Sequence, residues 1–466
     1  MKTTKVVLAN PPVVYSTTGT LENDFKCKEF VIPSNLWRIG FFRNVLNFCY
    51  RHWGLGKGVR YGVRAGSRWP WTTERPLYKL APYPFLMGYA AALLRHNGHA
   101  VEMMDAVICG ENSYDKFLSR IRRSNPDIVL MECSASTLDI DLWFAKRVSE
   151  FAEVAIAGSH VVQNAEELME KHPYVHYWLR GEYILSSVRM VSERKPGIYD
   201  SEILKDLDSV PFPFRDYPES TFYFEHTMPT PQPQLQIYAS KGCPFKCSYC
   251  LWPQTMYKGQ VALRRPEKVA EEIRQCVARY GYKSILFDDD TFNIGDERIS
   301  SLCDHLKEIG LPWTMMGRLD CSPLWLFDKM VHCGCVGMRF GVETFDPSVS
   351  KNIKKGLEVE NVHDTLKYLS STYPKLRLDV MMMKNLPGQT KEIVQHDMEI
   401  LDDLGFVEKR GIDILRSYRV ASCVPFPGTS LYEDFVRKYG LDSLRGMEMY
   451  DGNQEKFRGL LEKLYD

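Results

Sequence analysis

The stretch Lys241-Gly-Cys-Pro-Phe-Lys-Cys-Ser-Tyr-Cys-Leu-Trp252 carries three cysteines in a C-x3-C-x2-C array. It directly follows a strand-like segment, Leu235-Gln-Ile-Tyr-Ala239. Thiolates are the usual protein ligands of iron–sulfur clusters. Three thiolates on one short loop (Cys243, Cys247 and Cys250) can bind three corners of a cubane, which leaves the fourth iron without a protein ligand. The array therefore predicts a [4Fe–4S] cluster whose open iron binds a small molecule.

Structural zinc and disulfides explain the array less well. A structural zinc site uses four ligands, and no cysteine or histidine lies between Cys250 and Cys276. His226 lies well upstream, across a proline-rich stretch. The thirteen cysteines of the chain have no regular spacing, so a disulfide framework is not expected.

The array resembles that of the radical SAM superfamily, and the aromatic Tyr249 just before the last cysteine also matches that family's pattern. In the family, the open iron chelates S-adenosylmethionine (SAM), and one electron cleaves SAM to a 5′-deoxyadenosyl radical. The resemblance implies that Cys243, Cys247 and Cys250 ligate the cluster and that Tyr249 contacts SAM.

Length and charge are consistent with a multidomain enzyme. The chain has 466 residues, enough for two or three domains. Its 59 basic residues balance 59 acidic ones, so no charge excess points to nucleic acid or an anionic membrane. The longest apolar run, from Phe85 to Leu94, is shorter than the roughly 20 residues that span a bilayer. We therefore predict a cytoplasmic protein with no signal peptide and no membrane span.

Strand-like and helical segments alternate through residues 1–195, which predicts a parallel α/β sheet of Rossmann-like type. The predicted strands cover residues 5–9, 99–104, 127–131, 154–157 and 177–179. The predicted helices cover residues 83–96, 113–124, 138–152 and 165–171. In such sheets, ligands bind beyond the carboxyl ends of the strands.

Those strand ends carry small or polar residues, which let a large ligand approach the backbone. Four segments (Asn10-Pro-Pro12, Pro126-Asp-Ile-Val129, Gly158-Ser-His160 and Arg180-Gly-Glu182) together resemble the cobalamin-binding domain of cobalamin-dependent radical SAM enzymes. No histidine has an aspartate two residues before it, so the resemblance implies a cobalamin without a histidine on its lower face. The implied cofactor contacts are Ser134, Ser136, Thr137, Gly158, Ser159, His160, Gly181 and Glu182.

Two further segments flank or interrupt this domain. Residues 13–80 form an insert rich in tryptophan and arginine, which is either a lid packed over the sheet edge or a cover for cobalamin and substrate. Residues 196–233 are rich in proline and are interpreted as an interdomain linker.

From residue 234 to about 440 the alternation resumes with six predicted strands, the partial (β/α)6 barrel that the resemblance implies, and residues 441–466 form a short extension. Polar side chains cluster at the expected barrel mouth. Each is either an ordinary surface group or a SAM contact. The implied SAM contacts are Asp288, Asp289, Arg318 (a fork for a carboxylate), Glu343 and Pro387, the last within Asn385-Leu-Pro-Gly-Gln-Thr390.

Together the resemblances imply a cobalamin-dependent radical SAM C-methyltransferase that acts on an unactivated carbon of a small molecule. A non-methylating radical cyclase, similar to the magnesium-protoporphyrin ester cyclase, is the alternative among enzymes, and a cofactor-binding sensor is the alternative outside them. A methylthiotransferase fits poorly, because the first domain has only scattered cysteines. The insert suggests a planar or anionic substrate. The implied partner is an electron donor such as flavodoxin or ferredoxin, with no nucleic acid.

Overall fold

The computed structural model describes residues 3–12, 14–16, 59–61, 82–109, 114–133, 138–225, 228, 230–408 and 414–440. Within the insert 13–80, only the antiparallel pair β2 (Val14–Ser16) and β3 (Val59–Tyr61) is described. The predicted lid, the strand-end residues Ser134, Ser136 and Thr137, and the extension 441–466 lie outside the described residues.

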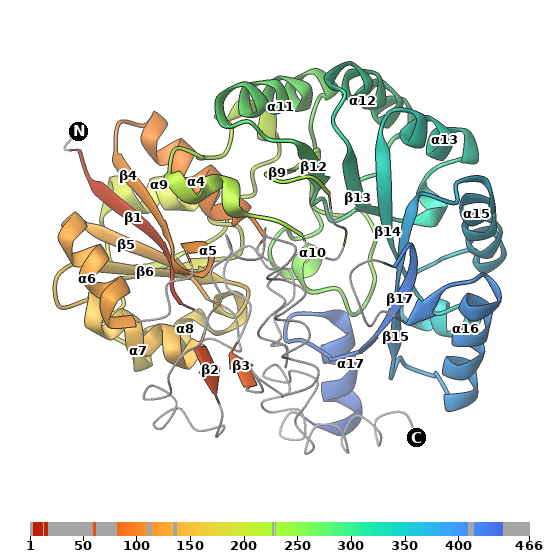
Figure 1. Cartoon of the computed structure of the whole chain (residues 1–466). Helices are drawn as coiled ribbons and strands as arrows, with labels where there is room; N and C mark the ends of the chain where they lie inside the picture. The colour runs from red at the N-terminus through yellow and green to blue at the C-terminus, as the bar shows by residue number, and fades with distance from the viewer. Residues whose placement is uncertain are drawn as a thin grey trace, which may run out of the picture.

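The first domain is a six-stranded parallel sheet covered by helices on both faces, as predicted (Figure 1). The strand order is β4 (Ala100–Asp105), β1 (Lys5–Asn10), β5 (Ile128–Glu132), β6 (Glu153–Gly158), β7 (Tyr177–Arg180) and β8 (Gly197–Tyr199). Alternate side chains of β1 enter two different cores: Val6 and Leu8 pack with α4 (Phe85–His96) and α9 (Ile184–Glu193), whereas Val7 and Ala9 pack on the other face. This alternation follows from the two-residue period of a strand.

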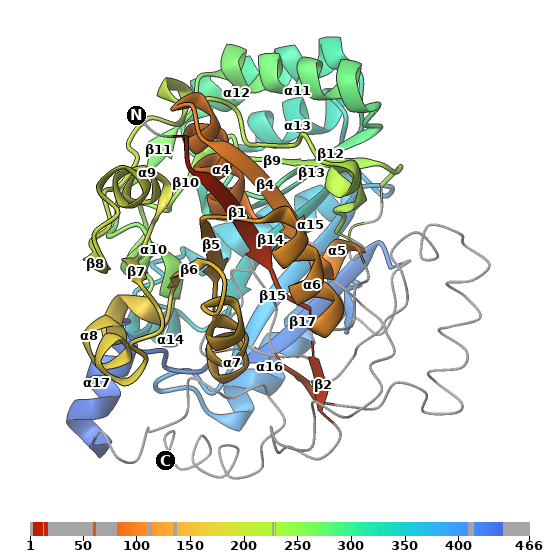
Figure 2. The same ribbon diagram turned by 90° about the vertical axis from the view of Figure 1, so that its left-hand side faces the viewer.

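The second face is covered by α6 (Tyr114–Ser124), α7 (Leu138–Val148) and α8 (Val161–Lys171). In the first sheet and the helices that cover it, α5 (Ala106–Cys109), α9 and β8 were not expected from the sequence. β8 lies inside the stretch interpreted as a linker, yet it pairs with β7 as the last strand of the first sheet. Figure 2 views the molecule from the side of this sheet, with the barrel behind it.

The second domain is a seven-stranded parallel sheet that curves into a partial barrel. Its order is β16 (Val407–Glu408), β17 (Arg416–Ser422), β15 (Arg377–Lys384), β14 (Cys335–Glu343), β13 (Trp313–Gly317), β12 (Ser284–Phe287) and β9 (Gln234–Ile237). All six predicted strands are present, and the short edge strand β16 is added to them.

Helices line the outside of the barrel in chain order: α11 (Pro266–Tyr280), α12 (Asp296–Ile309), α13 (Leu324–His332), α15 (Val359–Thr372) and α16 (Lys391–Asp403). Shorter elements complete the fold: β10 (Ser240–Lys241), α10 (Leu251–Thr255), β11 (Ala262–Leu263), α14 (Pro347–Asn352), α17 (Ser430–Tyr439) and the 3₁₀ turns η2 (Leu207–Ser209), η3 (Pro218–Phe222) and η4 (Leu319–Cys321). Among the described helices, none combines the length and apolar character needed to cross a bilayer.

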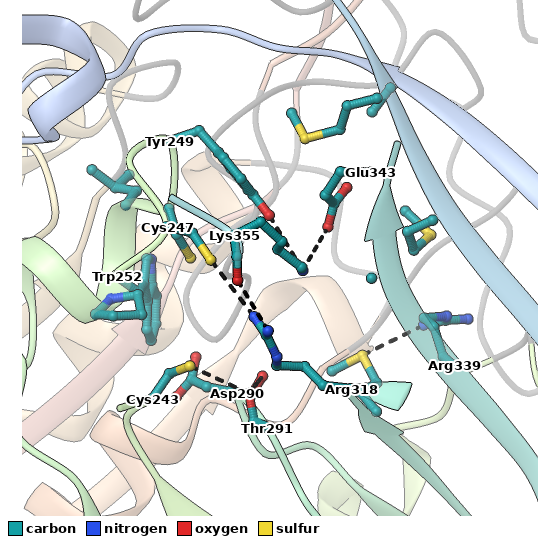
Figure 3. Close-up of a pocket in the computed structure, with 18 of the residues that line it drawn as sticks. Cys243, Cys247, Tyr249, Trp252, Asp290, Thr291, Arg318, Arg339, Glu343 and Lys355 are labelled. Atoms are coloured by element: carbon teal, nitrogen blue, oxygen red, sulfur yellow. Dashed lines mark hydrogen bonds and ion pairs between the residues drawn. The ribbon is translucent and has the colours of Figure 1, made fainter. Parts of the chain in front are cut away.

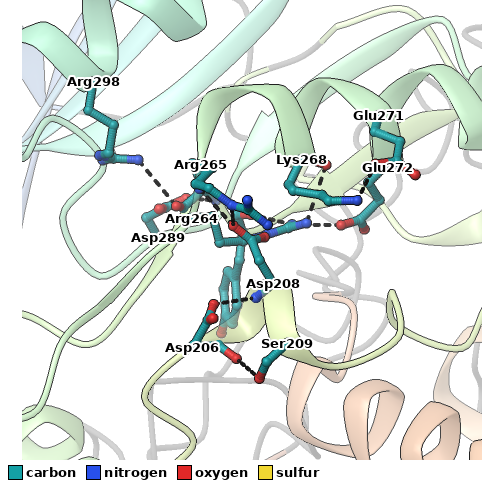
Figure 4. Close-up of polar contacts among 12 residues, drawn as sticks. Asp206, Asp208, Ser209, Arg264, Arg265, Lys268, Glu271, Glu272, Asp289 and Arg298 are labelled. Atoms are coloured by element: carbon teal, nitrogen blue, oxygen red, sulfur yellow. Dashed lines mark hydrogen bonds and ion pairs between the residues drawn. The ribbon is translucent and has the colours of Figure 1, made fainter.

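Buried ion pairs attach the proline-rich segment to the barrel (Figure 4). Arg264, which is fully buried, pairs with Asp208 of η2 at 3.0 Å and with Glu272 of α11 at 2.6 Å. Arg215 packs over the ring of Tyr83, with its guanidinium carbon 4.0 Å from the ring centroid, and donates to the carbonyl of Gln236 at 2.6 Å. The segment therefore links the two domains through packed, hydrogen-bonded contacts.

Candidate functional site

The amino-terminal side of the cysteine loop is held by two aspartates at the end of β12. Asp289 is fully buried and accepts hydrogen bonds from the Ala239 backbone N–H (3.1 Å) and the Ser240 hydroxyl (2.5 Å). Asp290 accepts from the Gly242 N–H at 2.9 Å. Gly242 has φ +82°, and a Cβ there would lie 2.1 Å from the Gln260 carbonyl oxygen. Only glycine fits this turn, which leads directly into Cys243.

The carboxyl-terminal side of the loop is held by a single amide. Gln254 donates to the backbone carbonyls of Cys247, Ser248 and Cys250, at 3.1, 3.2 and 2.7 Å. The Ser248 N–H also donates to the carbonyl of Ile353 at 2.9 Å. Because both ends of the loop are tied to rigid elements, the three cysteines are held in place before any cofactor binds.

The three cysteines line one wall of a cavity of about 220 Å³ (Figure 3). The other walls come from the carboxyl ends of β13, β14, β15 and β17, through Met316, Arg339, Gly341, Met381 and Ala421. Burial raises the pKa of the Cys243 and Cys250 thiols, so a bound metal is what would hold these sulfurs as thiolates. In the described part of the chain, no three histidine, cysteine, aspartate or glutamate side chains are arranged to hold a single metal ion. Three sulfur donors on one loop fit a multi-iron cluster with an open iron instead.

Arg318 lies against the cysteine loop, but its fork is not free for a SAM carboxylate. Its Nε and Nη2 donate to both oxygens of Asp320, at 2.9 and 2.6 Å. The guanidinium carbon lies 3.7 Å from the centroid of the Phe245 ring, and Nη1 lies 3.9 Å from Cys247 Sγ. Arg318 therefore braces the loop through Phe245 and Cys247, while it also lines the cavity; its contact with SAM stays a prediction.

Opposite the loop, Glu343 and Lys355 place two opposite charges in the cavity wall. A bulge between Gly341 and Glu343 turns the end of β14, and Glu343 has φ +73°. Such bulges re-aim side chains beside functional sites. Lys355 Nζ lies 3.3 Å from Glu343 Oε1 and 3.5 Å from the hydroxyl of Tyr249 (Figure 3). Burial raises the pKa of Tyr249, so this hydroxyl stays protonated.

Lys355 is a site residue that sequence reasoning missed. The other charged groups in the cavity wall are occupied elsewhere: Asp290 holds Gly242, Arg318 holds Asp320, and Arg339 pairs with Asp379 at 2.8 Å. In the described structure, Glu343 and Lys355 have only each other and Tyr249 as polar partners. They form a pair of opposite charges that can bind the two charged groups of a zwitterion.

Several predicted residues lie outside the wall of this cavity. Asp288 and Asp289 do not line it, whereas the next two residues, Asp290 and Thr291, do. Pro387 also lies outside the lining, and its carbonyl accepts a hydrogen bond from Asn352 at 3.2 Å. The run Met381–Met383, which carried no predicted role, contributes three lining side chains.

At the carboxyl edge of the first sheet, two predicted contacts have structural explanations. Gly158 has φ +127°, and a Cβ there would lie 2.0 Å from the Cys133 carbonyl oxygen, so neighbouring backbone requires this glycine. The carboxylate of Glu182 is fully buried: Oε1 accepts from the Leu204 N–H at 2.7 Å, and Oε2 pairs with Lys241. Both oxygens of Glu182 are therefore used in contacts that join the domains, and its contact with a cofactor stays a prediction.

Ser159, His160 and Gly181 lie at the same edge. The His160 carbonyl accepts from Asn164 at 3.0 Å, and Gly181 has φ +59°.

Asn10, at the end of β1, had no predicted role of its own. It is 3% exposed, and its Oδ1 has no hydrogen-bond partner among the described residues. A buried acceptor without a donor is uncommon in a folded protein, which makes Asn10 a candidate ligand contact.

These features define a two-domain protein with a three-cysteine loop at the mouth of a partial parallel barrel. A family model, the radical SAM superfamily, matches residues 237–401. Those residues span the cysteine loop and β13, β14 and β15, three of the four strands whose carboxyl ends line the cavity. Residues 237–401 belong to the radical SAM superfamily.

Two curated relatives align over most of the chain. An uncharacterized methyltransferase of Pyrococcus horikoshii is 26% identical over 380 residues, which cover 75% of this chain and 78% of the relative. The cytidylyl-2-hydroxyethylphosphonate methyltransferase of Streptomyces wedmorensis is 23% identical over 445 residues, covering 77% and 79%.

Two solved structures share the two-domain fold. The radical SAM methyltransferase TsrM of Kitasatospora setae, solved with cobalamin and a [4Fe–4S] cluster, has a TM-score of 0.59 at 14% identity and covers 76% of this chain and 72% of its own. The cobalamin-dependent radical SAM enzyme OxsB, solved with aqua-cobalamin and SAM, has a TM-score of 0.58 at 14% identity, covering 81% and 63%. These likenesses confirm the predicted fold class.

Proposed function

We propose that this protein is a cobalamin-dependent radical SAM methyltransferase that adds a methyl group to an unactivated carbon of a small molecule. The observation that carries the proposal is the contact between the carboxyl edge of the first sheet and the cysteine loop of the barrel. Glu182 follows β7 at the carboxyl edge of the first sheet, and it pairs with Lys241, two residues before Cys243. The Glu182 N–H also donates to the Met256 carbonyl, just after α10. The ligand edge of the first sheet therefore adjoins the cysteine loop.

The chain's own residues would bind SAM as follows. Cys243, Cys247 and Cys250 would hold the cluster, which would supply, when bound and reduced, the electron that cleaves SAM. Lys355 would receive the carboxylate and Glu343 the ammonium group of its methionine part, because these two opposite charges pair with each other inside the cavity wall and not with groups outside it. Met381 and Val424 give the cavity apolar surface, which excludes water from the site where the radical forms.

Cobalamin, when bound, would supply the methyl group that is transferred. Asn10 and the small residues Ser159 and Gly181 lie at the edge where it would bind. No described residue offers a histidine preceded two positions earlier by aspartate, so we propose binding without a histidine on the lower face. The relatives named as methyltransferases, and the cobalamin in TsrM and OxsB, support this part of the proposal.

The test is a labelling experiment on the full chain, reconstituted anaerobically with iron, sulfide and hydroxocobalamin. With methyl-labelled SAM, methylation predicts label in the product, together with equal amounts of S-adenosylhomocysteine and 5′-deoxyadenosine. One SAM gives its methyl group, and a second is reductively cleaved to take a hydrogen atom from the substrate, so two electrons enter per product. An unlabelled product formed with 5′-deoxyadenosine alone would contradict methylation and favour a cyclase.

A further inference from the structure

Three surface loops meet beside the cluster. The cysteine loop (242–250) is joined to the segment 351–356 by the bond from the Ser248 N–H to the Ile353 carbonyl, at 2.9 Å. That segment is joined to the loop 384–391 by the bond from Asn352 to the Pro387 carbonyl, at 3.2 Å. The three loops therefore form one continuous rim beside the cysteine array.

This rim has charge of one sign. Its exposed side chains include five lysines, which we call the lysine rim: Lys246, Lys351, Lys354, Lys384 and Lys391. The three loops contain no aspartate or glutamate, although the chain as a whole has equal numbers of acidic and basic residues. Acidic side chains appear only beyond the loops, as at Glu358 before α15 and Glu392 in α16. None of the five lysines forms an ion pair with a described residue, and all five side chains are exposed.

Lys246 is the rim lysine that lies within the cysteine loop itself. It lies between the ligands Cys243 and Cys247 and is exposed, whereas Cys247 is buried. An exposed lysine therefore lies one residue away from a buried ligand cysteine. The proposed reaction consumes electrons that no residue of the described chain can supply, so a donor must approach the cluster from outside.

We propose that the lysine rim is the docking surface for an acidic one-electron carrier protein, one that holds a flavin or an iron–sulfur centre. This inference rests on the proposed function, because it assumes that the cluster is reduced during turnover. In each encounter the carrier loses one electron and the cluster gains one. Clustered charge of one sign raises the rate of association with an oppositely charged partner and makes that rate fall with ionic strength.

The test compares two reductants on the same protein. The rim variant carries Lys351→Glu, Lys354→Glu, Lys384→Glu and Lys391→Glu and leaves Lys246 in place, so that the ligand loop is not altered. A control variant carries Lys195→Glu and Lys307→Glu, two exposed lysines away from the rim. The rate of 5′-deoxyadenosine formation is measured with reduced flavodoxin and, separately, with dithionite, which is small enough to need no docking surface.

With flavodoxin at low ionic strength, we expect the rim variant to lose about tenfold or more in kcat/KM, since electrostatic steering changes association rates by about 10–10³-fold. The loss should shrink as salt is added, and the control variant should match the wild type. With dithionite, all three proteins should react equally. Equal flavodoxin rates in the rim variant and wild type would overturn the proposal. An equal loss with both reductants would also overturn it, because the lysines would then act on the cluster or SAM.

A binding measurement separates this surface from one for nucleic acid. Wild-type protein that bound a single-stranded RNA oligonucleotide through the same lysines, and showed no salt-dependent flavodoxin step, would contradict the carrier assignment. Dithionite-driven SAM cleavage reports the cluster and the SAM cavity alone. Failure of the proposed methyl transfer would therefore leave the comparison of the two reductants intact.

Discussion

Glu182 and Lys241 form an ion pair across the boundary between the two domains, and both side chains are almost completely removed from solvent. Lys241 also donates to the Leu204 carbonyl at 2.9 Å. Burial raises the pKa of Glu182 and lowers the pKa of Lys241, while their mutual attraction opposes both shifts. Because Lys241 lies two residues before Cys243, the pair connects the edge of the first sheet to the cysteine loop.

Breaking this pair on one side should be costly. Lys241→Met leaves the Glu182 carboxylate buried without a cation, which should lower the free energy of unfolding by about 3–5 kcal/mol. The double variant Lys241→Met/Glu182→Gln should recover much of that loss. Urea denaturation measures both. As a control, Lys268→Met breaks a half-exposed pair with Glu271 and should cost at most about 1 kcal/mol. If the double variant lost as much free energy of unfolding as Lys241→Met and Glu182→Gln lose together, the account would be contradicted.

Arg318→Lys should weaken cluster retention without weakening SAM binding. A lysine cannot make the bidentate contact with Asp320 or stack on Phe245 in the same way, so the loop loses its brace. The iron content after anaerobic gel filtration should fall, while the SAM dissociation constant of the cluster-loaded fraction stays unchanged. Full iron content with weakened SAM binding would instead support a direct contact with the SAM carboxylate.

Lys355→Met should weaken SAM binding without lowering cluster retention. We expect normal iron content and a SAM dissociation constant raised about ten- to a hundredfold, because a hydrogen bond to a charged group contributes about 1.5–3 kcal/mol. Lys354→Met is the matched control, since the neighbouring Lys354 is exposed and does not line the cavity. Anaerobic calorimetry would measure both. Equal SAM affinity in the two variants would remove Lys355 from the proposed site.

Gly158→Ala tests whether this glycine serves the fold. The new methyl group would meet the Cys133 carbonyl, and overpacking of this kind costs about 1–3 kcal/mol, in addition to about 1–2 kcal/mol for the unfavourable φ. Gly98→Ala, at φ +84° with open space around it, should show only the second cost. Thermal unfolding without any cofactor compares them. Equal stability of the two variants would show that the close approach to Cys133 is unimportant.

Most strands of the two sheets, all except β8 and β16, could be predicted because each is a short apolar run ending at a turn signal. Local patterns also predicted the cysteine loop and placed Glu343 at the cavity. The three consecutive aspartates 288–290 show the limit of such patterns. A shift of one residue at the end of β12 decides that Asp290, rather than Asp288 or Asp289, lines the cavity.

Most other differences between prediction and structure arise from contacts between residues that are far apart in the sequence. Glu182 has a partner 59 positions away, and no local pattern indicates such a contact. Lys355 follows no motif, and it reaches the cavity because the Ile353 carbonyl binds the cysteine loop. Arg318 is different: Asp320 stands only two positions on, and this near neighbour was a visible sign that the fork could be occupied.

The most direct test of the account is SAM cleavage by single cysteine variants. Cys243→Ala, Cys247→Ala and Cys250→Ala, each reconstituted anaerobically and reduced with dithionite, should lose the broad iron–sulfur absorbance and form no 5′-deoxyadenosine. Cys321→Ala is the control, because Cys321 lies beside Asp320 but outside the array; it should keep both signals. Formation of 5′-deoxyadenosine by any of the three array variants at the wild-type rate would contradict the assignment of the cluster.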